Sequence, residues 1–396
     1  MSDLLDLAHY ADGPPHALFR RLRAEAPVSW QPEANGTGFW AVTRYADVVQ
    51  VSRDPATFSS YAGGTMVPDA PPPQLAVLRM MMLNMDPPQH TKLRLLVNKG
   101  FTPSAVARLR ERVGGLARNI VDAVVDRGGC DFVADIAGEL PSYVIAELVG
   151  IPLDDGRALY RLTECMHTSA QTPAEHADIL AATQEMMSYA HTLREAKRAR
   201  AGDDIASVLL KAEVDGEQLS DIEFDMFFML LINAGGDTTR NLVAGGMLAL
   251  IDHPDQWARL RADLDLLPPA IEEMLRWVTP VVHFRRTATR AATLRGVRIS
   301  PGDKVVVFYS SANRDEEVFH ASDRFDITRS PNEHLAFGGG GAHFCLGANL
   351  ARLEIRALFE QVLTRLPHLR LAGPVERLRS NFINGPRRMP VRFTAR

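Results

Sequence analysis

The feature that most constrains the fold is a long central region, residues 90–277, in which apolar side chains recur with helical spacing. Breaks in this pattern fall near Gly128, residues 150–155 and Gly202, where glycine and proline interrupt the periodicity. Short strand-like segments flank the region, at residues 28–31, 38–43, 284–289, 297–299 and 305–308. We therefore expect a mainly α-helical protein with a minor β portion.

The chain shows no boundary between domains. Its length alone suggests about two or three domains, but we find no internal repeat, low-complexity tract or linker, and 46% of the residues are hydrophobic. A segment rich in glycine, proline and methionine, residues 61–88, predicts a long loop of the kind that is usually functional. We expect residues 1–396 to form one large domain.

Charge and cysteine usage exclude several classes of protein. A net charge of −4 gives no basis for binding nucleic acid or an acidic membrane. The three cysteines lie far apart, which indicates neither a disulfide framework nor a zinc site. The N-terminus lacks a signal-peptide pattern, and the most apolar span, residues 226–251, carries charged and amide side chains. We expect a cytoplasmic protein without a stable membrane anchor.

Cys345 stands among five glycines, directly before an apolar-periodic helix, in residues 334–354. A thiolate at a helix N-terminus is stabilised by the helix dipole and by free N–H donors. Such a sulfur could bind a metal axially, while the glycines let the backbone lie flat against a planar ligand. The alternative is a buried, inert cysteine behind a flexible loop. The cysteine alone does not decide between the two.

The segment from residue 230 to 240 contains an unusual helix interior. An apolar helix opens at Ser220, and Glu223 completes a capping box. It then meets the poor helix formers of residues 235–239. One interpretation is a helix boundary with Asp237 as an N-cap. The other is a distorted helix with a groove for a small ligand, to which Asp237 and Thr238 deliver protons.

Glu273 and Arg276 share a helical face at i,i+3 spacing, which by itself is typical of a solvated surface pair. Other basic or imidazole groups are scattered along the chain. These are His90, Arg94, Arg286 and His343. Each alone is expected at the surface. Together they could neutralise a dianion, at about 4 kcal/mol per contact for an effective dielectric near 20.

Taken in order, these motifs resemble those of the cytochrome P450 family of haem-thiolate monooxygenases. The shared pieces are His-x-x-x-Arg at 90–94, Ala-Gly-Gly-Asp-Thr-Thr at 234–239, Glu-x-x-Arg at 273–276, Asp-Arg-Phe at 323–325 and the cysteine loop. The resemblance runs from about residue 14 to residue 393. Any one motif could arise by chance, but five in the expected order are specific.

The resemblance implies a haem b cofactor whose iron is bound by the thiolate of Cys345. The other haem-binding positions that it implies are His90, Arg94, Ala234, Gly235, Arg286, Phe337, His343 and Gly347. Asp237 and Thr238 match the acid–alcohol pair that protonates bound dioxygen. A buried structural triad is implied for Glu273, Arg276 and Arg324.

The loop also resembles a particular bacterial branch, which oxidises sterol side chains and methyl-branched lipids. The spacing from Phe337 to Cys345 is one residue longer than the commoner family spacing, which leaves open whether Phe337 packs beside the sulfur. The implied activity is hydroxylation or epoxidation of a sterol, branched lipid, terpenoid or polyketide, with O2 and with electrons from NAD(P)H through a ferredoxin and its reductase. The expected substrate contacts are Met82, Leu83, Leu230, Asn233, Val281, Val282, Phe382 and Ile383.

Two other functions are compatible with the same motifs. One is a peroxygenase or decarboxylase driven by hydrogen peroxide, although such enzymes tend to lack the acid–alcohol pair found at Asp237 and Thr238. The other is a haem-thiolate protein that binds a ligand without catalysis. An intact proton-delivery pair and an apolar pocket argue against that function.

Overall fold

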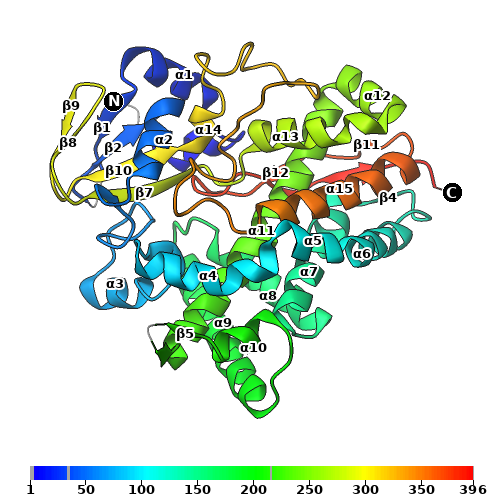
Figure 1. Cartoon of the computed structure of the whole chain (residues 1–396). Coiled ribbons are helices and arrows are strands. Elements are labelled where there is room, and N and C mark those ends of the chain that lie inside the picture. The colour runs from blue at the N-terminus through cyan, green and yellow to red at the C-terminus, as the bar shows by residue number, and fades with distance from the viewer. Residues whose placement is uncertain (1–3, 34–35, 215, 396) are drawn as a thin grey trace.

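The computed structural model describes residues 4–33, 36–214 and 216–395, and helices form the larger part of its regular structure (Figure 1). The helices are α1 His16–Glu25, α2 Tyr45–Arg53, α3 Pro72–Leu78, α4 Gln89–Phe101, α5 Pro103–Arg108, α6 Arg110–Asp122, α7 Glu139–Val149, α8 Leu153–Met166, α9 Pro173–Ala199, α10 Ile205–Leu210, α11 Asp221–Asp252, α12 Pro254–Ala262, α13 Leu267–Val278, α14 Tyr309–Ala312 and α15 Ala348–Arg365. Shorter helical turns are η1 Leu7–Tyr10, η2 Met82–Asn84, η3 Val133–Ala137 and η4 Leu264–Leu266. The expected mainly helical fold is confirmed.

The β portion is small, and most of it lies at one end of the molecule beside α1 and α2 (Figure 1). The strands are β1 Val28–Gln31, β2 Phe39–Val42, β3 Phe58–Ser59, β4 Gly129–Asp131, β5 Glu213–Val214, β6 Glu217–Gln218, β7 His283–Ala288, β8 Ala292–Leu294, β9 Val297–Ile299, β10 Lys304–Phe308, β11 Arg370–Leu371, β12 Glu376–Arg377, β13 Pro386–Arg388 and β14 Pro390–Arg392. The largest sheet has the order β1-β2-β10-β7-β3.

Strand β10 lies in the middle of this sheet and is apolar on both faces. It pairs in parallel with β2 and antiparallel with β7. Because side chains alternate along a strand, Val305 and Val307 enter one hydrophobic cluster, while Val306 and Phe308 enter another. The same register places Arg286 of β7 opposite Val305. The sheet thus fixes the position of a buried arginine.

Helix α11 runs through the helical part of the molecule and packs against α7, α8, α9, α13 and α15. Its capping box is present, with the Ser220 N–H donating to Glu223 Oε2 at 2.9 Å. The helix continues without interruption through residues 235–239. The alternative of a helix boundary at Asp237 is therefore wrong.

The two glycines inside α11 serve helix packing. A Cβ on Gly235 would lie 3.0 Å from Cδ1 of Ile145 in α7, and one on Gly236 would lie 3.1 Å from Cδ2 of Tyr160 in α8. Larger side chains would push both neighbours away, since packed interiors have little free space. An added Cβ on Gly235 would therefore face α7, while Gly235 itself is half-buried beside the exposed Ala234, so its predicted part in a ligand groove stays a prediction.

The long loop expected over residues 61–88 is interrupted by regular structure. Helix α3 begins at Pro72, within the prolines that marked the least regular part of the sequence. Proline is tolerated in the first helical turn because its missing N–H has no intrahelical partner there. The expectation of a continuous loop is wrong for this part of the segment.

Within the described ranges, no single helix has both the length and the apolarity needed to cross a membrane. The segments Val133–Val149 and Leu153–His167 reach those values only as a pair bent by 116°. Both segments pack against α11.

Candidate functional site

Cys345 lies just before α15, as predicted. Its backbone N–H donates to the carbonyl of Phe337 at 2.9 Å, which closes the loop in front of the helix. Burial raises the pKa of the Cys345 thiol, while the N–H of Gly347 and the guanidinium groups of Arg94 and Arg352 act to lower it. The side chain nevertheless keeps accessible surface. A thiol that is both surrounded by protein and accessible lies on the wall of an interior space.

The glycine run before Cys345 is seated on α2. Gly340 and Gly341 have φ values of 87° and 73°, which side chains rarely adopt. A Cβ on Gly339 would lie 2.4 Å from Oγ of Ser52, and one on Gly341 would lie 2.6 Å from the Ser52 carbonyl oxygen. This part of the loop thus contacts the end of α2, and the expectation that the glycines let the backbone lie flat against a planar ligand stays a prediction.

Phe337 remains next to Cys345 despite the longer loop. Its carbonyl accepts the Cys345 N–H, and the Cζ atom of Arg352 lies 4.6 Å from the centre of its ring. The ring centres of Phe337 and Phe344 are 6.4 Å apart. The additional residue is accommodated in the glycine run, so it does not displace Phe337 from the cysteine.

Four basic or imidazole groups predicted from scattered positions come together beside this loop. The rings of His90 and His343 have centres 4.3 Å apart, and Nη1 of Arg94 donates to the Ala342 carbonyl at 3.0 Å. Burial, together with Arg94, lowers the pKa of His90 to about 4. The pKa of His343 is lowered to about 2, first by burial and then by Arg286, His90 and Arg94. The two arginines thus lie close enough to lower the pKa values of both imidazole rings.

This cluster is poorly balanced by negative charge. Asp86 acts on both His90 and Arg286, but its carboxylate also accepts the backbone N–H of Ser60 at 2.8 Å. Nδ1 of His90 is buried and has no hydrogen-bond partner among the residues that the structure describes. A buried ring nitrogen without a partner, beside the guanidinium groups of Arg94 and Arg286, favours an anionic ligand. The cluster therefore fits the two carboxylates of a haem.

One face of α11 is not packed against protein. Ala234 is exposed and Leu230, Asn233 and Thr238 are half-buried, whereas most of the helix is buried. Positions 230, 234 and 238 follow one another at i,i+4 spacing and so share a face. The accessible face in the middle of a central helix borders an interior space, as Cys345 does.

Asp237 is completely buried and lies in a chain of ion pairs. Its Oδ2 is 2.7 Å from Nδ1 of His167, and its Oδ1 is 2.6 Å from Nη2 of Arg240. Arg240 in turn pairs with Glu164 at 3.2 Å, and Glu164 with Arg387 at 3.4 Å. Burial acts to raise the pKa of Asp237, but Arg240 and His167 outweigh it and the pKa is lowered. The carboxyl group is therefore ionised.

Thr238 follows directly, and its hydroxyl donates to the Ala234 carbonyl at 3.0 Å. Sequence reasoning found Asp237 and Thr238 but missed His167, which lies at the end of α8. No local motif marks His167, because only the packing of α8 on α11 brings it to the carboxylate.

The apolar positions predicted for substrate contact fall into two groups. Val281 pairs with Ile383, and the Val282 N–H donates to the Phe382 carbonyl at 2.8 Å, so two distant segments are joined. The core side chains, which have almost no accessible surface, are Met82, Val282 and Ile383. Those with accessible surface are Leu83, Leu230, Asn233, Val281 and Phe382. We retain the second group as pocket candidates.

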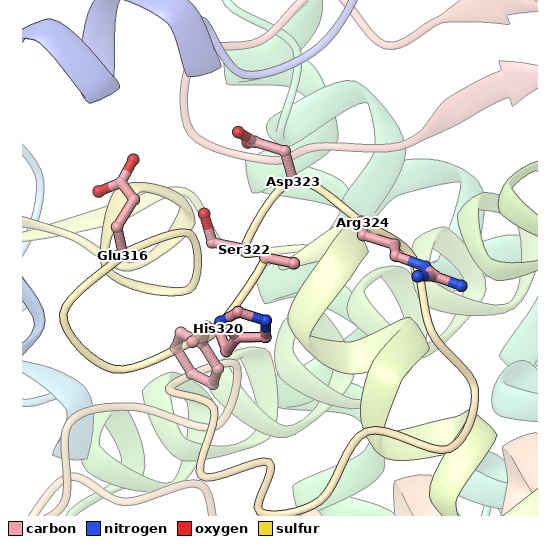
Figure 2. A pocket seen from close by; sticks show the side chains of 7 residues that line it. Glu316, His320, Ser322, Asp323 and Arg324 are labelled. Atoms are coloured by element: carbon pink, nitrogen blue, oxygen red, sulfur yellow. The ribbon is translucent and has the colours of Figure 1, made fainter.

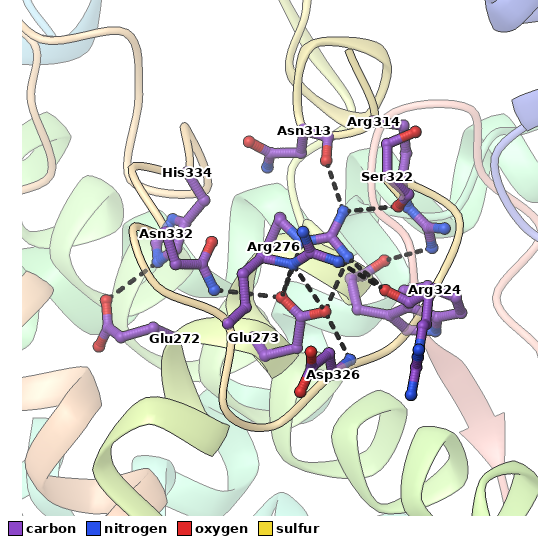
Figure 3. Close-up of polar contacts among 12 residues, drawn as sticks. Glu272, Glu273, Arg276, Asn313, Arg314, Ser322, Arg324, Asp326, Asn332 and His334 are labelled. Atoms are coloured by element: carbon purple, nitrogen blue, oxygen red, sulfur yellow. Dashed lines mark hydrogen bonds and ion pairs between the residues drawn. The ribbon is translucent and has the colours of Figure 1, made fainter. Parts of the chain in front are cut away.

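The pair Glu273–Arg276 is buried and does not lie on the surface (Figure 3). Arg276 donates to both carboxylate oxygens of Glu273 at 2.8 Å. It also donates to the backbone carbonyls of Asn313, Ser322 and Arg324, at 2.9, 2.8 and 3.1 Å. This network ties α13 to the long segment that leads to the cysteine loop.

The third member of the predicted triad is wrong. Arg324 contributes only its backbone carbonyl, and its side chain is exposed. The second guanidinium on Glu273 belongs to Arg329, whose Nε lies 3.1 Å from Oε2. Arg329 also donates to the carbonyls of His320 and Ala321, which holds the segment in place. Arg329 lies five positions after Arg324, and it is the side chain of Arg329 that pairs with Glu273.

Exchange of these arginines for alanine should have very different effects. Arg329→Ala leaves part of the fully buried Glu273 charge uncompensated, so we expect the free energy of unfolding to fall by about 3 kcal/mol. Arg324→Ala removes an exposed side chain and should change it by less than about 0.5 kcal/mol. Urea unfolding of both variants tests this, and equal losses would contradict the assignment.

A surface hollow of about 570 Å³ lies beside this network (Figure 2). It is lined by Glu316, Phe319, His320, Ala321, Ser322, Asp323 and Arg324. Apart from Arg324, it contains none of the predicted site residues. The hollow is therefore separate from the space that Cys345 borders.

Comparison with known proteins agrees with this geometry. A family model described as Cytochrome P450 matches residues 160–370. Steroid C26-monooxygenase of Mycobacterium tuberculosis is 41% identical over 100% of this chain and 93% of its own length. Methyl-branched lipid omega-hydroxylase of Mycobacterium bovis is 41% identical over 95% of this chain and 90% of its own length.

A solved structure is also similar over nearly the whole chain. It is a Mycobacterium marinum cytochrome P450 in complex with pseudoionone. Its TM-score is 0.93 at 41% identity, and the similarity covers 99% of this chain and 98% of that one. The range matched by the family model contains α11, the Glu273 network and Cys345.

Proposed function

Because the chain belongs to the cytochrome P450 family, we propose that it inserts one oxygen atom from O2 into a C–H bond of a sterol or a methyl-branched lipid. The family, the mainly helical single-domain fold, the haem cofactor and the monooxygenase class are confirmed by the similarities above. The observations that carry the proposal are the accessible surface of Cys345 in front of α15 and the accessible face of α11 at residues 230, 234 and 238.

We propose that Cys345 binds the haem iron and that the positive cluster binds the propionates. When bound, haem supplies the activation of dioxygen, and a thiolate ligand favours O–O cleavage by donating electron density. The propionate partners would be His90, Arg94, Arg286 and His343. The unpartnered Nδ1 of His90 supports this assignment, because a carboxylate would satisfy it.

Asp237 and Thr238 form the proposed path for protons. Asp237 lies on the side of α11 that faces α8, while Thr238 lies on the accessible face beside Ala234. We propose that Asp237 holds a proton at its carboxylate and that the Thr238 hydroxyl carries it into the interior space. A carboxyl group and a hydroxyl exchange a proton once they come within hydrogen-bond reach, so the path requires the Asp237 side chain to turn from His167 toward Thr238.

The substrate class follows from the relatives and from the side chains on the accessible face. The relatives include a steroid C26-monooxygenase and a methyl-branched lipid omega-hydroxylase. The available lining is mostly apolar, with Leu230, Val281 and Phe382. Asn233 adds one polar group, whose Oδ1 is buried and without a partner in the described part of the chain. Such a lining suits a long apolar molecule with one hydrogen-bond donor.

We propose that electrons come from NAD(P)H through a separate ferredoxin and reductase and that residues 1–396 act as one catalytic unit. The resemblance to the soluble bacterial branch supports both points, as does the overlap with relatives over nearly their whole length.

Titration of the purified enzyme tests the substrate class. We expect sterols with a branched side chain and methyl-branched fatty acids to shift the iron spin state, and the matched straight-chain fatty acid to bind at least about tenfold more weakly. Product analysis with NAD(P)H, ferredoxin and reductase should find one added oxygen. Product formation with hydrogen peroxide alone, and none with the reductase system, would instead indicate a peroxygenase.

A further inference from the structure

We propose that His167 passes protons from solvent to Asp237, an inference that rests on the proposed monooxygenase function. His167 is the residue that ends α8, and its ring reaches Asp237 across the interface with α11. The Nδ1 to Oδ2 distance is 2.7 Å. No sequence motif pointed to this residue.

Burial differs between the two partners. The Asp237 side chain has 0% exposed surface, whereas that of His167 has 16%. The carboxylate therefore has no contact with solvent of its own, and protons must reach it through a group that touches it. His167 contacts the carboxylate and also keeps accessible surface.

The other groups beside Asp237 cannot serve this purpose. Arg240 is 2% exposed, and a guanidinium keeps its proton throughout the physiological range. The side-chain amide of Asn241, which also lowers the pKa of Asp237, does not titrate. An imidazole takes up and releases protons between about pH 5 and pH 8. Among the described neighbours of Asp237, His167 alone combines contact, solvent access and suitable chemistry.

The charges around His167 come from three elements. Glu164 lies one turn before His167 on α8. It forms ion pairs with Arg240 from α11 and with Arg387 from β13. Tyr160 in α8 lies under Arg240, with the ring centre 5.0 Å from the Cζ atom. Phe382 closes the remaining side, at 6.2 Å between ring centres. The contacts of the imidazole ring itself are those with Asp237 and Phe382.

The proton balance of the step is simple. Since Asp237 is ionised, Nδ1 carries a hydrogen and donates it to Oδ2. Protonation of Nε2 by solvent gives an imidazolium; its Nδ1–H bond then breaks as an O–H bond forms on Asp237. The ring is left neutral with its hydrogen on Nε2. After Asp237 passes its proton on, exchange with solvent restores the hydrogen on Nδ1, and no electrons move.

The decisive variant is His167→Asn. The asparagine amide occupies the position of Nδ1 and still donates to Asp237, but it cannot take up a proton. We expect product formation to fall about tenfold or more and substrate binding to stay unchanged. The wild-type and His167→Asn rates should also depend differently on pH, since only the histidine side chain can take up a proton. His320→Asn, at an exposed position in the surface hollow, is the matched control.

A measurement independent of turnover tests the contact itself. In protein labelled with ¹⁵N-histidine and held as the diamagnetic ferrous carbon monoxide complex, we expect a slowly exchanging imidazole N–H signal that is lost in both His167→Asn and Asp237→Asn. A wild-type rate and pH profile in His167→Asn, or the absence of this signal from the wild type, would overturn the proposal. If the wild type oxidised no sterol or branched lipid while the signal was present, the proposed function would fail instead.

Discussion

Cys345→Ala is expected to abolish both the thiolate-ligated haem and the monooxygenase activity. The residue is the one thiol that borders the interior space beside the basic cluster, and its sulfur faces the N–H of Gly347 at the start of α15. Without it, the reduced protein should no longer give the red-shifted Soret band with carbon monoxide, since that band requires a thiolate on the iron. Absorbance spectra and product yield report the two losses separately.

The other two cysteines provide the controls. Cys130 and Cys165 are half-buried, and burial raises the pKa of Cys130 to about 12, so neither is a favourable thiolate. Alanine at either position should leave the carbon monoxide spectrum unchanged. Persistence of the red-shifted band in Cys345→Ala would show that another residue binds the iron.

Asp237→Asn is expected to lower the rate of product formation about a hundredfold while substrate binding is retained. The amide cannot hold a proton for transfer, and losses of this size are typical when a proton-transfer group is removed. Most reducing equivalents should then appear as hydrogen peroxide. The substitution also weakens a buried ion pair with Arg240, so the free energy of unfolding should fall by about 3 kcal/mol. Steady-state turnover, peroxide assay and urea unfolding measure these effects.

A variant of a second buried carboxylate on α11 distinguishes an effect on stability from an effect on catalysis. Asp225 pairs with Arg194 at 2.5 Å, and both side chains are largely buried. Asp225→Asn should therefore destabilise the protein to a comparable extent, yet leave the yield of product per reducing equivalent unchanged. If both variants lost product yield equally, the effect of Asp237 would be structural.

Much of the fold follows from local patterns in the sequence. Helical spacing, the capping box of Ser220 and Glu223 and the short apolar run at β10 are properties of neighbouring residues, and they predict these elements to within one or two positions. The prediction of secondary structure failed at prolines. A proline in the first turn of α3 resembles a loop signal, although it is compatible with a helix there.

Site residues that belong to a sequence motif could be predicted, whereas those brought together only by packing could not. His90, Arg94, Arg286 and His343 meet as the family resemblance implied. The choice of Arg329 over Arg324, however, depends on how the segment after α14 folds back onto α13.

The contact between His167 and Asp237 joins residues seventy positions apart, and no spacing rule reaches that far. The contact of the glycine run with α2 was also not predictable, because its neighbour Ser52 precedes it by more than 280 positions.

The contact between the cysteine loop and α2 has a consequence for thermal unfolding. Helix α2 packs against β10 and α14 and belongs to the sheet cluster that includes Val48, Val51 and Leu335. Phe337 and Leu346, on either side of the sulfur, pack against the helical core. Cys345 thus lies between two cores, and its position depends on both. With Cys345 as the proposed iron ligand, we expect release of the haem and unfolding of the sheet to form a single cooperative transition.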